Sequence, residues 1–332
     1  MCSKKFIITI DTEEDNWGSF AAPSFTTENI QRIPYLQMIF DNFNVKPTYL
    51  VTYPITTDQR SVSILKNILD AGKCEIGAHC HPWNTPPFEE EKNARNSMLS
   101  NLPSDLQLKK LTALHETISN NFGIEPISFR AGRFGFDTEV AKNILKLGYK
   151  IDTSVTPFVD WSSYHGPNFS EYGWQPFRFP KDNISTKNIN HQLLEVPATI
   201  DFIPCDIKVV KLFYKILSRK TNNSLKLKRF FSRIKLLQKI WLSPEMDTST
   251  MEINLIKNLL MKGCKIFNMV FHSTSLLFGL SPFVRDRNDE RKFFDNIKKV
   301  SLFFKDKEIA SIKLSDVLEI HEPSDPNYQW RF

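Results

Sequence analysis

Long hydrophobic runs are missing from the 332-residue sequence, and this argues against a chain that crosses a membrane. Its apolar stretches, such as Phe6 to Ile10, are far shorter than the roughly 20 residues that span a bilayer. The first residues lead through this short segment directly into acids, without the apolar region of a secretory signal. We therefore expect the protein to remain in the cytoplasm.

Cysteine is scarce and scattered. The five residues form an odd number and contain no Cys-x-x-Cys pair: Cys2, Cys74, Cys80, Cys205 and Cys264. This pattern predicts reduced thiols and excludes both a disulfide framework and a zinc finger. Hydrophobic residues make up 41% and charged residues 24%, which are ordinary proportions for a globular protein and exclude a disordered chain.

Acidic residues are absent between Ile207 and Ile240, where eleven basic residues occur. Since the 43 basic residues of the chain exceed its 37 acidic ones by only six, the positive excess lies in this segment. Apolar residues return there at helical spacing, which predicts a basic helical insertion at about 205–245. Its helices either pack on the rest of the protein or bind an anionic membrane surface through 207–241. No nucleic-acid-reading motif accompanies the charge, so we expect no nucleic-acid partner.

Short β-branched runs alternate with helical patterns along most of the chain. The extended runs are 6–11, 47–53, 74–80, 127–131, 150–155, 193–200 and 265–273. The helical patterns are 26–44, 58–71, 104–122, 137–147 and 251–262. Such alternation predicts an α/β fold with a parallel sheet or a (β/α) barrel.

Unusual polar residues recur where five of the predicted strands end. They are the acidic run Asp11 to Asp15, the pair His79 and His81, the pair Arg130 and Arg133, the run Asp152 to Ser154, and His272 with Ser273. In open α/β sheets and barrels, the carboxyl ends of the strands carry the active site. We therefore expect these side chains to meet at one edge of the sheet.

The histidines and acids are spaced for metal binding. If the strand continues through His79 and His81, both imidazoles lie on one face, and Cys80 points away. Asp11, Glu13 and Asp15 share a face in the same way. Two histidines and one carboxylate can bind a metal and leave positions open for water and substrate. The competing interpretations are ordinary hydrogen-bonded loop histidines and a solvated acidic turn, and the third ligand is Glu13 or Asp15.

The remaining polar residues also have two interpretations each. Arg130 and Arg133 could lie at the surface, but an arginine at the end of an apolar strand is well suited to hold a carboxylate. Asp152 could cap a turn, and His272 could be a buried histidine with satisfied hydrogen bonds.

Together these segments resemble the motifs of the polysaccharide deacetylases of the NodB-homology type, carbohydrate esterase family four, in the family's order from residue 6 to about 285. The His-x-His-Pro-Trp wording at 79–83 and the His-Ser-Thr-Ser-Leu wording at 272–276 are most similar to the WalW-like subgroup, which is associated with surface-polysaccharide genes. The acidic motif is Asp11-x-Glu13 instead of an adjacent Asp pair, the histidines are two residues apart instead of four, and the arginine motif lacks its proline.

The resemblance implies one domain over residues 1–332, folded as a distorted, incomplete (β/α) barrel. It also implies a hydrolase that removes an N-acetyl group from an amino sugar with a divalent metal, zinc by preference. The implied metal ligands are Glu13, His79 and His81, the catalytic residues Asp11, Arg130, Asp152 and His272, and the substrate-binding residues Trp83 and Arg133. In these roles Asp11 is the base, Arg130 holds a carboxylate, and His272 is the acid.

The absence of an export signal adds an expectation about the substrate, which is a sugar nucleotide, a lipid-linked sugar or an oligosaccharide, met in the cytoplasm or at the inner membrane face. Two other functions remain compatible with the same residues. One is a deformylase or another small-acyl amidohydrolase, and the other is a non-catalytic carbohydrate-binding relative.

Overall fold

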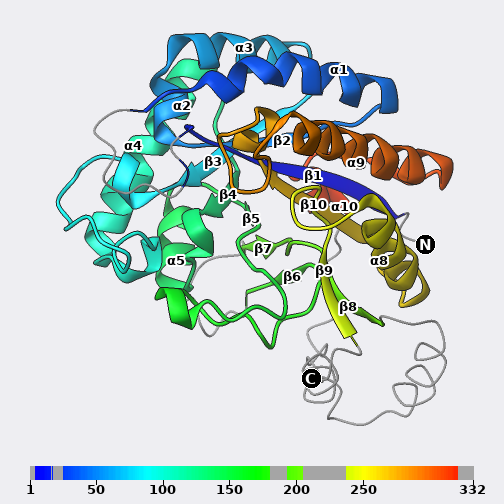
Figure 1. The fold of residues 1–332 in the computed structure, drawn as a ribbon. Helices are drawn as coiled ribbons and strands as arrows, with labels where there is room; N and C mark the ends of the chain where they lie inside the picture. The colour runs from blue at the N-terminus through cyan, green and yellow to red at the C-terminus, as the bar shows by residue number, and fades with distance from the viewer. Residues whose placement is uncertain (1–3, 16, 18–24, 180–192, 205–236, 321–332) are drawn as a thin grey trace.

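An open, curled β-sheet forms the centre of the protein, which we describe from a computed structural model of residues 4–15, 17, 25–179, 193–204 and 237–320 (Figure 1). Its strands follow the order β10-β1-β2-β3-β4-β5-β7-β6, and β11 also pairs with β1. All pairs in this sheet are parallel except β6 with β7. A separate antiparallel pair contains β8 and β9.

The strands are β1 Lys5–Thr12, β2 Thr48–Val51, β3 Glu75–Cys80, β4 Ser128–Ala131, β5 Ile151–Asp152, β6 Phe177–Arg178, β7 Leu194–Glu195, β8 Ile200–Pro204, β9 Leu237–Trp241, β10 Ile266–His272 and β11 Ala310–Ser311. The α-helices are α1 Ile33–Phe43, α2 Tyr53–Thr57, α3 Gln59–Asp70, α4 Ser104–Phe122, α5 Thr138–Lys146, α8 Ser249–Met261, α9 Arg287–Asp306 and α10 Val317–Ile320. Short 3₁₀ helices are η1 Glu28–Arg32, η2 Pro82–Asn84, η3 Leu99–Asn101, η4 Gly132–Phe134, η5 Ser162–Tyr164 and η6 Ser273–Leu276.

Strand β1 shows why the sheet has two different faces. Phe6, Ile8 and Ile10 belong to the large core beneath the helices. Because successive side chains of a strand point to opposite faces, Thr9 and Asp11 lie on the other, concave face. There the Thr9 hydroxyl donates to Asn268 Oδ1 of the neighbouring β10 at 3.0 Å. The inside of the curled sheet is therefore partly polar, and Asp11 lies at its carboxyl end.

The larger helices form a continuous outer layer around the sheet (Figure 1). Contacts run from α8 to α9, from α9 to α1, and onward through α3 and α4 to α5. Their buried faces follow helical spacing, as with Ile297, Val300 and Phe304 of α9. The ends of the sheet path, β10 and β6, are not paired with each other, so the barrel does not close. The predicted α/β fold, a distorted and incomplete (β/α) barrel, is confirmed.

Most of the predicted elements are present at nearly the predicted positions, and α4 has the bounds 104–122 that the pattern gave. The basic segment is different. Residues 205–236 lie outside the described residues, so the helical insertion stays a prediction there. Its last residues, Leu237–Trp241, form β9 and pair with β8, so the expectation of helix is wrong there. The buried residues Leu237 and Ile240 are three positions apart, which is helical spacing, so the apolar pattern alone could not reveal the strand.

The cysteines and the helices bear on two further predictions from the sequence. Cys74, Cys80 and Cys264 are free and buried, as predicted for reduced thiols. Within the described part of the chain, none of the helices combines the length and the apolar character that a membrane span requires. The division into one domain stays a prediction.

Candidate metal centre and active site

The carboxyl ends of β1, β3, β4 and β10 bring most of the predicted site residues together. The parallel register places Asp11 beside His272 and His79 beside Arg130. These side chains lie on the concave face, because their neighbours Ile10, Cys80, Ala131 and Phe271 belong to the core under the helices.

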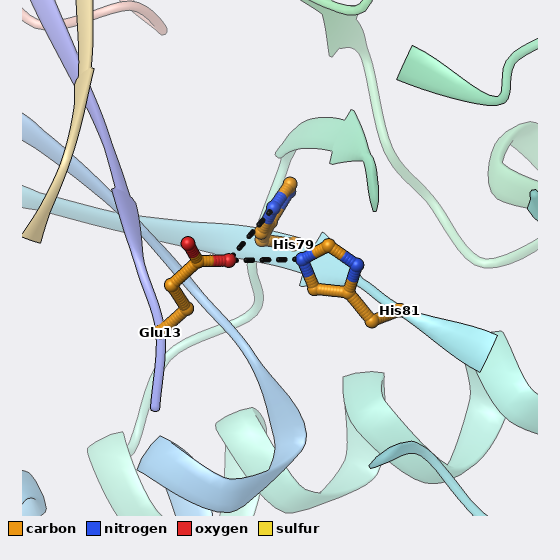
Figure 2. Close-up of side chains that lie close together, drawn as sticks. All are labelled: Glu13, His79 and His81. Carbon is orange, nitrogen blue, oxygen red and sulfur yellow. Dashed lines mark hydrogen bonds and ion pairs between the residues drawn. The ribbon is translucent and has the colours of Figure 1, made fainter. Parts of the chain in front are cut away.

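Glu13, His79 and His81 converge on one point, as Figure 2 shows. Glu13 Oε2 lies 3.0 Å from His81 Nε2 and 3.9 Å from His79 Nε2. All three ligand atoms lie within 4.8 Å of one another. Two imidazole nitrogens and one carboxylate oxygen are a donor set that suits zinc and leaves further coordination positions for other ligands.

The surroundings of the histidines favour metal binding. His79 Nδ1 lies 3.0 Å from the Arg130 carbonyl oxygen, which fixes the ring with Nε2 toward Glu13. The His81 ring packs against Trp83, with centroids 4.1 Å apart, and against Gly132, where a Cβ would collide with it. Burial lowers the pKa of both histidines to about 4, so they are neutral and their Nε2 lone pairs can accept a cation. The residues therefore fit the predicted divalent metal.

Glu13 is positioned by a residue that follows β10, the strand that pairs with one edge of β1. Its backbone N–H donates to Ser273 Oγ at 3.0 Å, just after β10 ends. Burial raises the pKa of its carboxyl group to about 7, against the opposing effect of His272 and His79. A buried carboxylate of this kind gains from a cation beside it.

Asp15, the alternative third ligand, points elsewhere. Its carboxylate accepts hydrogen bonds from the backbone N–H groups of Glu28 and Asn29, at 2.7 and 3.1 Å, and from Thr26 Oγ1. Asp15 therefore caps η1, because the chain leaves the strand after Thr12 and the alternation of faces stops. Glu14, which the alternation places on the opposite face from Asp11, instead lines the cavity and accepts a hydrogen bond from Asn84.

Asp11 and Arg130 form a buried ion pair. Arg130 Nη1 lies 2.5 Å from Asp11 Oδ1, and Arg130 Nη2 donates to Thr9 Oγ1 at 2.6 Å. Arg130 is 1% exposed, and its Nε donates to the Thr153 carbonyl oxygen. Burial acts to raise the pKa of Asp11, but Arg130, His79 and His272 together lower it to about 2. Asp11 is therefore ionised at neutral pH.

His272 has a partner that sequence reasoning missed. Glu245 Oε2 lies 3.0 Å from His272 Nδ1, and Glu245 Oε1 accepts the His272 backbone N–H at 3.1 Å. Burial acts to lower the pKa of His272, but Glu245 raises it more, and the net pKa is about 9. The imidazolium is thus stable at neutral pH. Glu245 follows Ser243-Pro244 after β9, and an acid after an apolar run is the only signal that could have selected it.

Asp152 does not lie with the other predicted catalytic residues. The register pairs it with Phe129, whose ring is in the core under the helices, so its side chain lies on the opposite face from Arg130. Its carboxylate accepts hydrogen bonds from the Ser154 backbone and hydroxyl at 3.0 and 2.8 Å. It is absent from the cavity wall. The structure therefore favours the turn-capping interpretation of Asp152 over the catalytic one.

A cavity of about 370 Å³ opens over the candidate metal ligands Glu13, His79 and His81. Trp83 and Arg133, predicted to bind substrate, both line it. Much of the rest of the wall is aromatic or sulfur-containing: Trp17, Met98, Phe134, Trp161, Tyr164, Trp241, Met246 and Phe283. This size is in the range of about 300–1,000 Å³ that is usual for small-molecule sites.

Comparisons with known proteins identify the fold. No family model matches the chain. No curated protein matches it either. Among solved structures, a Mycobacterium smegmatis protein described as a polysaccharide deacetylase has a TM-score of 0.54 at 14% identity, over 98% of this chain and 95% of that one. A Parabacteroides distasonis protein described as a glycoside hydrolase/deacetylase has a TM-score of 0.56 at 10% identity, over 96% and 71%.

A third structure carries a different activity on the same fold. The 4-alpha-glucanotransferase of Thermococcus litoralis has a TM-score of 0.57 at 13% identity, and the match covers 98% of this chain but 41% of that one. Polysaccharide deacetylases are thus among the proteins that share this fold, at identities where the fold alone is established. The similarity to the WalW-like subgroup stays a prediction.

Proposed function

We propose that this protein is a metal-dependent amidohydrolase that removes an N-acetyl group from an amino sugar. One observation carries the proposal: Asp11 lies between the metal centre and His272. Its Oδ2 atom is 3.8 Å from His79 Nε2 and 3.7 Å from His272 Nε2. An amide bound in this space lies within reach of a carboxylate that can accept a proton and of a histidine that can donate one.

The predicted ligands Glu13, His79 and His81 would hold the metal. A divalent metal held there supplies Lewis acidity, because it polarises an amide carbonyl and lowers the pKa of water. The chain supplies the rest. Neutral, buried imidazoles need no deprotonation before they bind a cation, and zinc fits the donor set of two nitrogens and one oxygen.

Asp11 is the proposed base. Its pKa of about 2 keeps it ionised, so it can accept a proton from the attacking water over the whole physiological range. Arg130 holds the carboxylate by its Oδ1 atom, which leaves Oδ2 directed toward His79 and His272. Arg130 is thus a positioning residue, and the buried Thr9 and Thr153 fix its own orientation.

His272 is the proposed acid. An amine leaves an amide poorly as an anion, so its nitrogen must receive a proton as the C–N bond breaks. With a pKa of about 9, His272 carries that proton at neutral pH. Glu245 orients the ring by its Nδ1 atom, and Nε2 then faces Asp11 and the cavity.

The choice of an N-acetylated sugar is supported by the resemblance of the motifs and by the fold shared with polysaccharide deacetylases. On the same basis we propose a role in surface-polysaccharide biosynthesis. The substrate is a sugar nucleotide, a lipid-linked sugar or an oligosaccharide, met in the cytoplasm or at the inner membrane face.

Amine release from N-acetylated sugars, measured with zinc-loaded protein, tests the proposal. Wild-type protein should release acetate and a free amine in equal amounts. Asp11→Asn and His272→Ala should each keep the metal and lose about 10²–10⁴-fold in rate. His115→Ala, which changes a histidine remote from the cavity, is the matched control and should retain the rate. Release of formate instead of acetate would identify a deformylase, and sugar binding without turnover would identify a non-catalytic relative.

A further inference from the structure

The loop that follows His272 contributes two buried serines beside the proposed acid. Helix η6 continues directly from β10, and the chain then turns back toward it, with the Gly279 N–H donating to the Val284 carbonyl oxygen at 2.8 Å. This turn places Ser281 Oγ 2.9 Å from Ser275 Oγ. Both side chains are buried, and neither lines the cavity. We refer to Ser275 and Ser281 as the serine pair.

The hydrogen bonds of the serine pair run in one direction. Ser281 Oγ accepts the Val284 backbone N–H at 3.2 Å. Ser275 Oγ donates to Glu245 Oε1, because an ionised carboxylate can only accept. Since a hydroxyl has one hydrogen to donate, Ser275 must accept its bond from Ser281. The donors therefore lead from Val284 to the carboxylate of Glu245, and each bond polarises the next.

The two carboxylate oxygens of Glu245 have different partners. Oε1 accepts from the Ser275 hydroxyl and from the His272 backbone N–H. Oε2 lies 3.0 Å from Nδ1 of the His272 ring and accepts from it when the ring is an imidazolium. The Glu245 side chain is only 3% exposed, so protein groups supply these donors. Because two donors hold Oε1, the carboxylate is kept from rotating, and Oε2 remains directed at Nδ1.

The orientation of Glu245 decides which nitrogen of the His272 ring gives up its proton. Nδ1 is held by the carboxylate, whereas Nε2 lies 3.7 Å from Asp11 Oδ2, in the space where the amide is cleaved. As the C–N bond breaks, its electron pair stays on the nitrogen, which takes a proton from an acid. That proton leaves from Nε2, and Nδ1 keeps its own proton on Glu245.

We propose that the serine pair positions the acid of the reaction, His272, through the carboxylate of Glu245. Ser275 holds that carboxylate, and Ser281 orients the Ser275 hydroxyl. The inference rests on the amide hydrolysis proposed above and adds to it two positioning residues that lie outside the cavity wall. It also gives the His-Ser-Thr-Ser-Leu segment a physical role, since its second serine holds the partner of its histidine.

Two substrates with different leaving groups test the proposal. The amine of methyl N-acetylglucosaminide needs a proton to leave, whereas p-nitrophenyl acetate releases p-nitrophenolate, a weak base that departs without one. With zinc-loaded protein, Ser275→Ala should lower kcat for the amide about 10- to 100-fold and keep KM within about twofold, because it removes a hydrogen bond to a charged group. The same variant should keep its metal content, and its kcat for the ester should stay within about twofold of the wild-type value.

A double variant tests whether the two serines act in series. Ser281→Ala should lower kcat for the amide about two- to fivefold, because Ser275 keeps its bond to Glu245 and loses the donor that orients it. Ser275→Ala with Ser281→Ala should lose no more than Ser275→Ala alone, since Ser281 acts only through Ser275. Ser301→Ala is the matched control and should behave as wild type. Ser301 is a buried serine of α9 whose Oγ has no hydrogen-bond partner within the described part of the chain.

The outcomes separate the serine pair from the proposed function. An unchanged kcat in Ser275→Ala, equal losses on amide and ester, or additive losses in the double variant would overturn the positioning role while the hydrolase stands. If wild-type protein hydrolyses no amide, the proposed function fails instead. In that case, or where the ester is not a substrate, the NMR signal of the His272 Nδ1 proton decides, identified by its loss in His272→Ala. This proton should exchange with water faster in Ser275→Ala than in Ser301→Ala, and equal exchange rates would overturn the proposal.

Discussion

Glu245 lies 27 residues before His272 in the sequence, yet its carboxylate contacts both the ring and the backbone N–H of that histidine. In the proposed reaction His272 acts as an acid, so the rate is lost as the pH rises through its pKa of about 9. Glu245→Gln removes the charge that raises this pKa. The basic limb of the pH–rate profile should therefore move to lower pH by about one to three units.

The control for Glu245 is another glutamate that pairs with a histidine. Glu125 Oε2 lies 3.0 Å from His115 Nε2, far from the cavity wall. Glu125→Gln should leave the pH–rate profile as it is. A basic limb that stays in place in Glu245→Gln would show that another group supplies the proton.

Glu13 and Asp15 form a second test at the scale of single residues, since the sequence alone left the third ligand open between them. Glu13→Ala should lose the metal. Asp15→Ala should keep it and lose about 0.5–2 kcal/mol of unfolding free energy, because its carboxylate caps η1. Metal titration and urea unfolding of both variants measure the two effects. Metal loss in Asp15→Ala with retention in Glu13→Ala would exchange the two roles.

These residues show how far strand alternation predicts a site. It succeeds for His79 and His81 because β3 stays regular through Cys80, which is buried in the core. It fails at Asp15 because β1 ends at Thr12 and a turn follows. Glu245 could not be found this way, since only the folded chain brings the end of β9 beside β10.

At the scale of elements, α4 fixes the loop that follows the histidine strand. Lys110 of α4 has a completely buried side chain, and its Nζ donates to the carbonyl oxygens of Pro82, Thr85 and Pro87 at 2.7–2.9 Å. Glu90 lies 2.9 Å from the same nitrogen. One ammonium group thus holds residues 82–90, which include the cavity residue Trp83.

Lys110→Met should therefore destabilise the protein. Removing the ammonium leaves a buried carboxylate and three carbonyl groups without their donor, which costs about 3–5 kcal/mol of unfolding free energy. Lys109→Met is the neighbouring control, because Lys109 and its partner Glu89 are both 51% exposed and such a pair contributes about 0–1 kcal/mol. Urea unfolding of both variants compares them. Equal, small losses would show that Lys110 does not hold the loop.

Helix α9 and strand β5 differ from what the sequence predicts. Helix α9 was not predicted, although Asp286 caps it and Phe293, Ile297, Val300 and Phe304 follow helical spacing. Its highly charged first turn obscured that pattern. The sequence predicts the strand at β5 but not its register, and the register turns Asp152 toward the face opposite Arg130.

At the scale of the whole molecule, the order of strands and helices predicts an α/β fold with a parallel sheet or a (β/α) barrel, because each element has a regular buried face. The incomplete barrel in particular was implied by the resemblance of the motifs. The charge distribution adds a prediction for the basic segment. Basic residues near an anionic bilayer contribute about 1 kcal/mol each. The protein should bind anionic vesicles in a salt-sensitive manner, and a joint change of Lys228, Arg229, Arg233 and Lys235 to Gln should weaken this binding while metal content stays intact. Vesicle sedimentation measures it, and equal binding to neutral vesicles would contradict it.

The central claim is that Glu13, His79 and His81 form a metal centre. Calorimetric titration of chelator-treated protein with zinc tests it most directly. We predict one zinc ion per chain in the wild type, an affinity lower by more than about a hundredfold in His79→Ala, and unchanged binding in His115→Ala. Wild-type protein that binds no zinc or other divalent metal, or His79→Ala protein that binds it as tightly as the wild type, would contradict the claim.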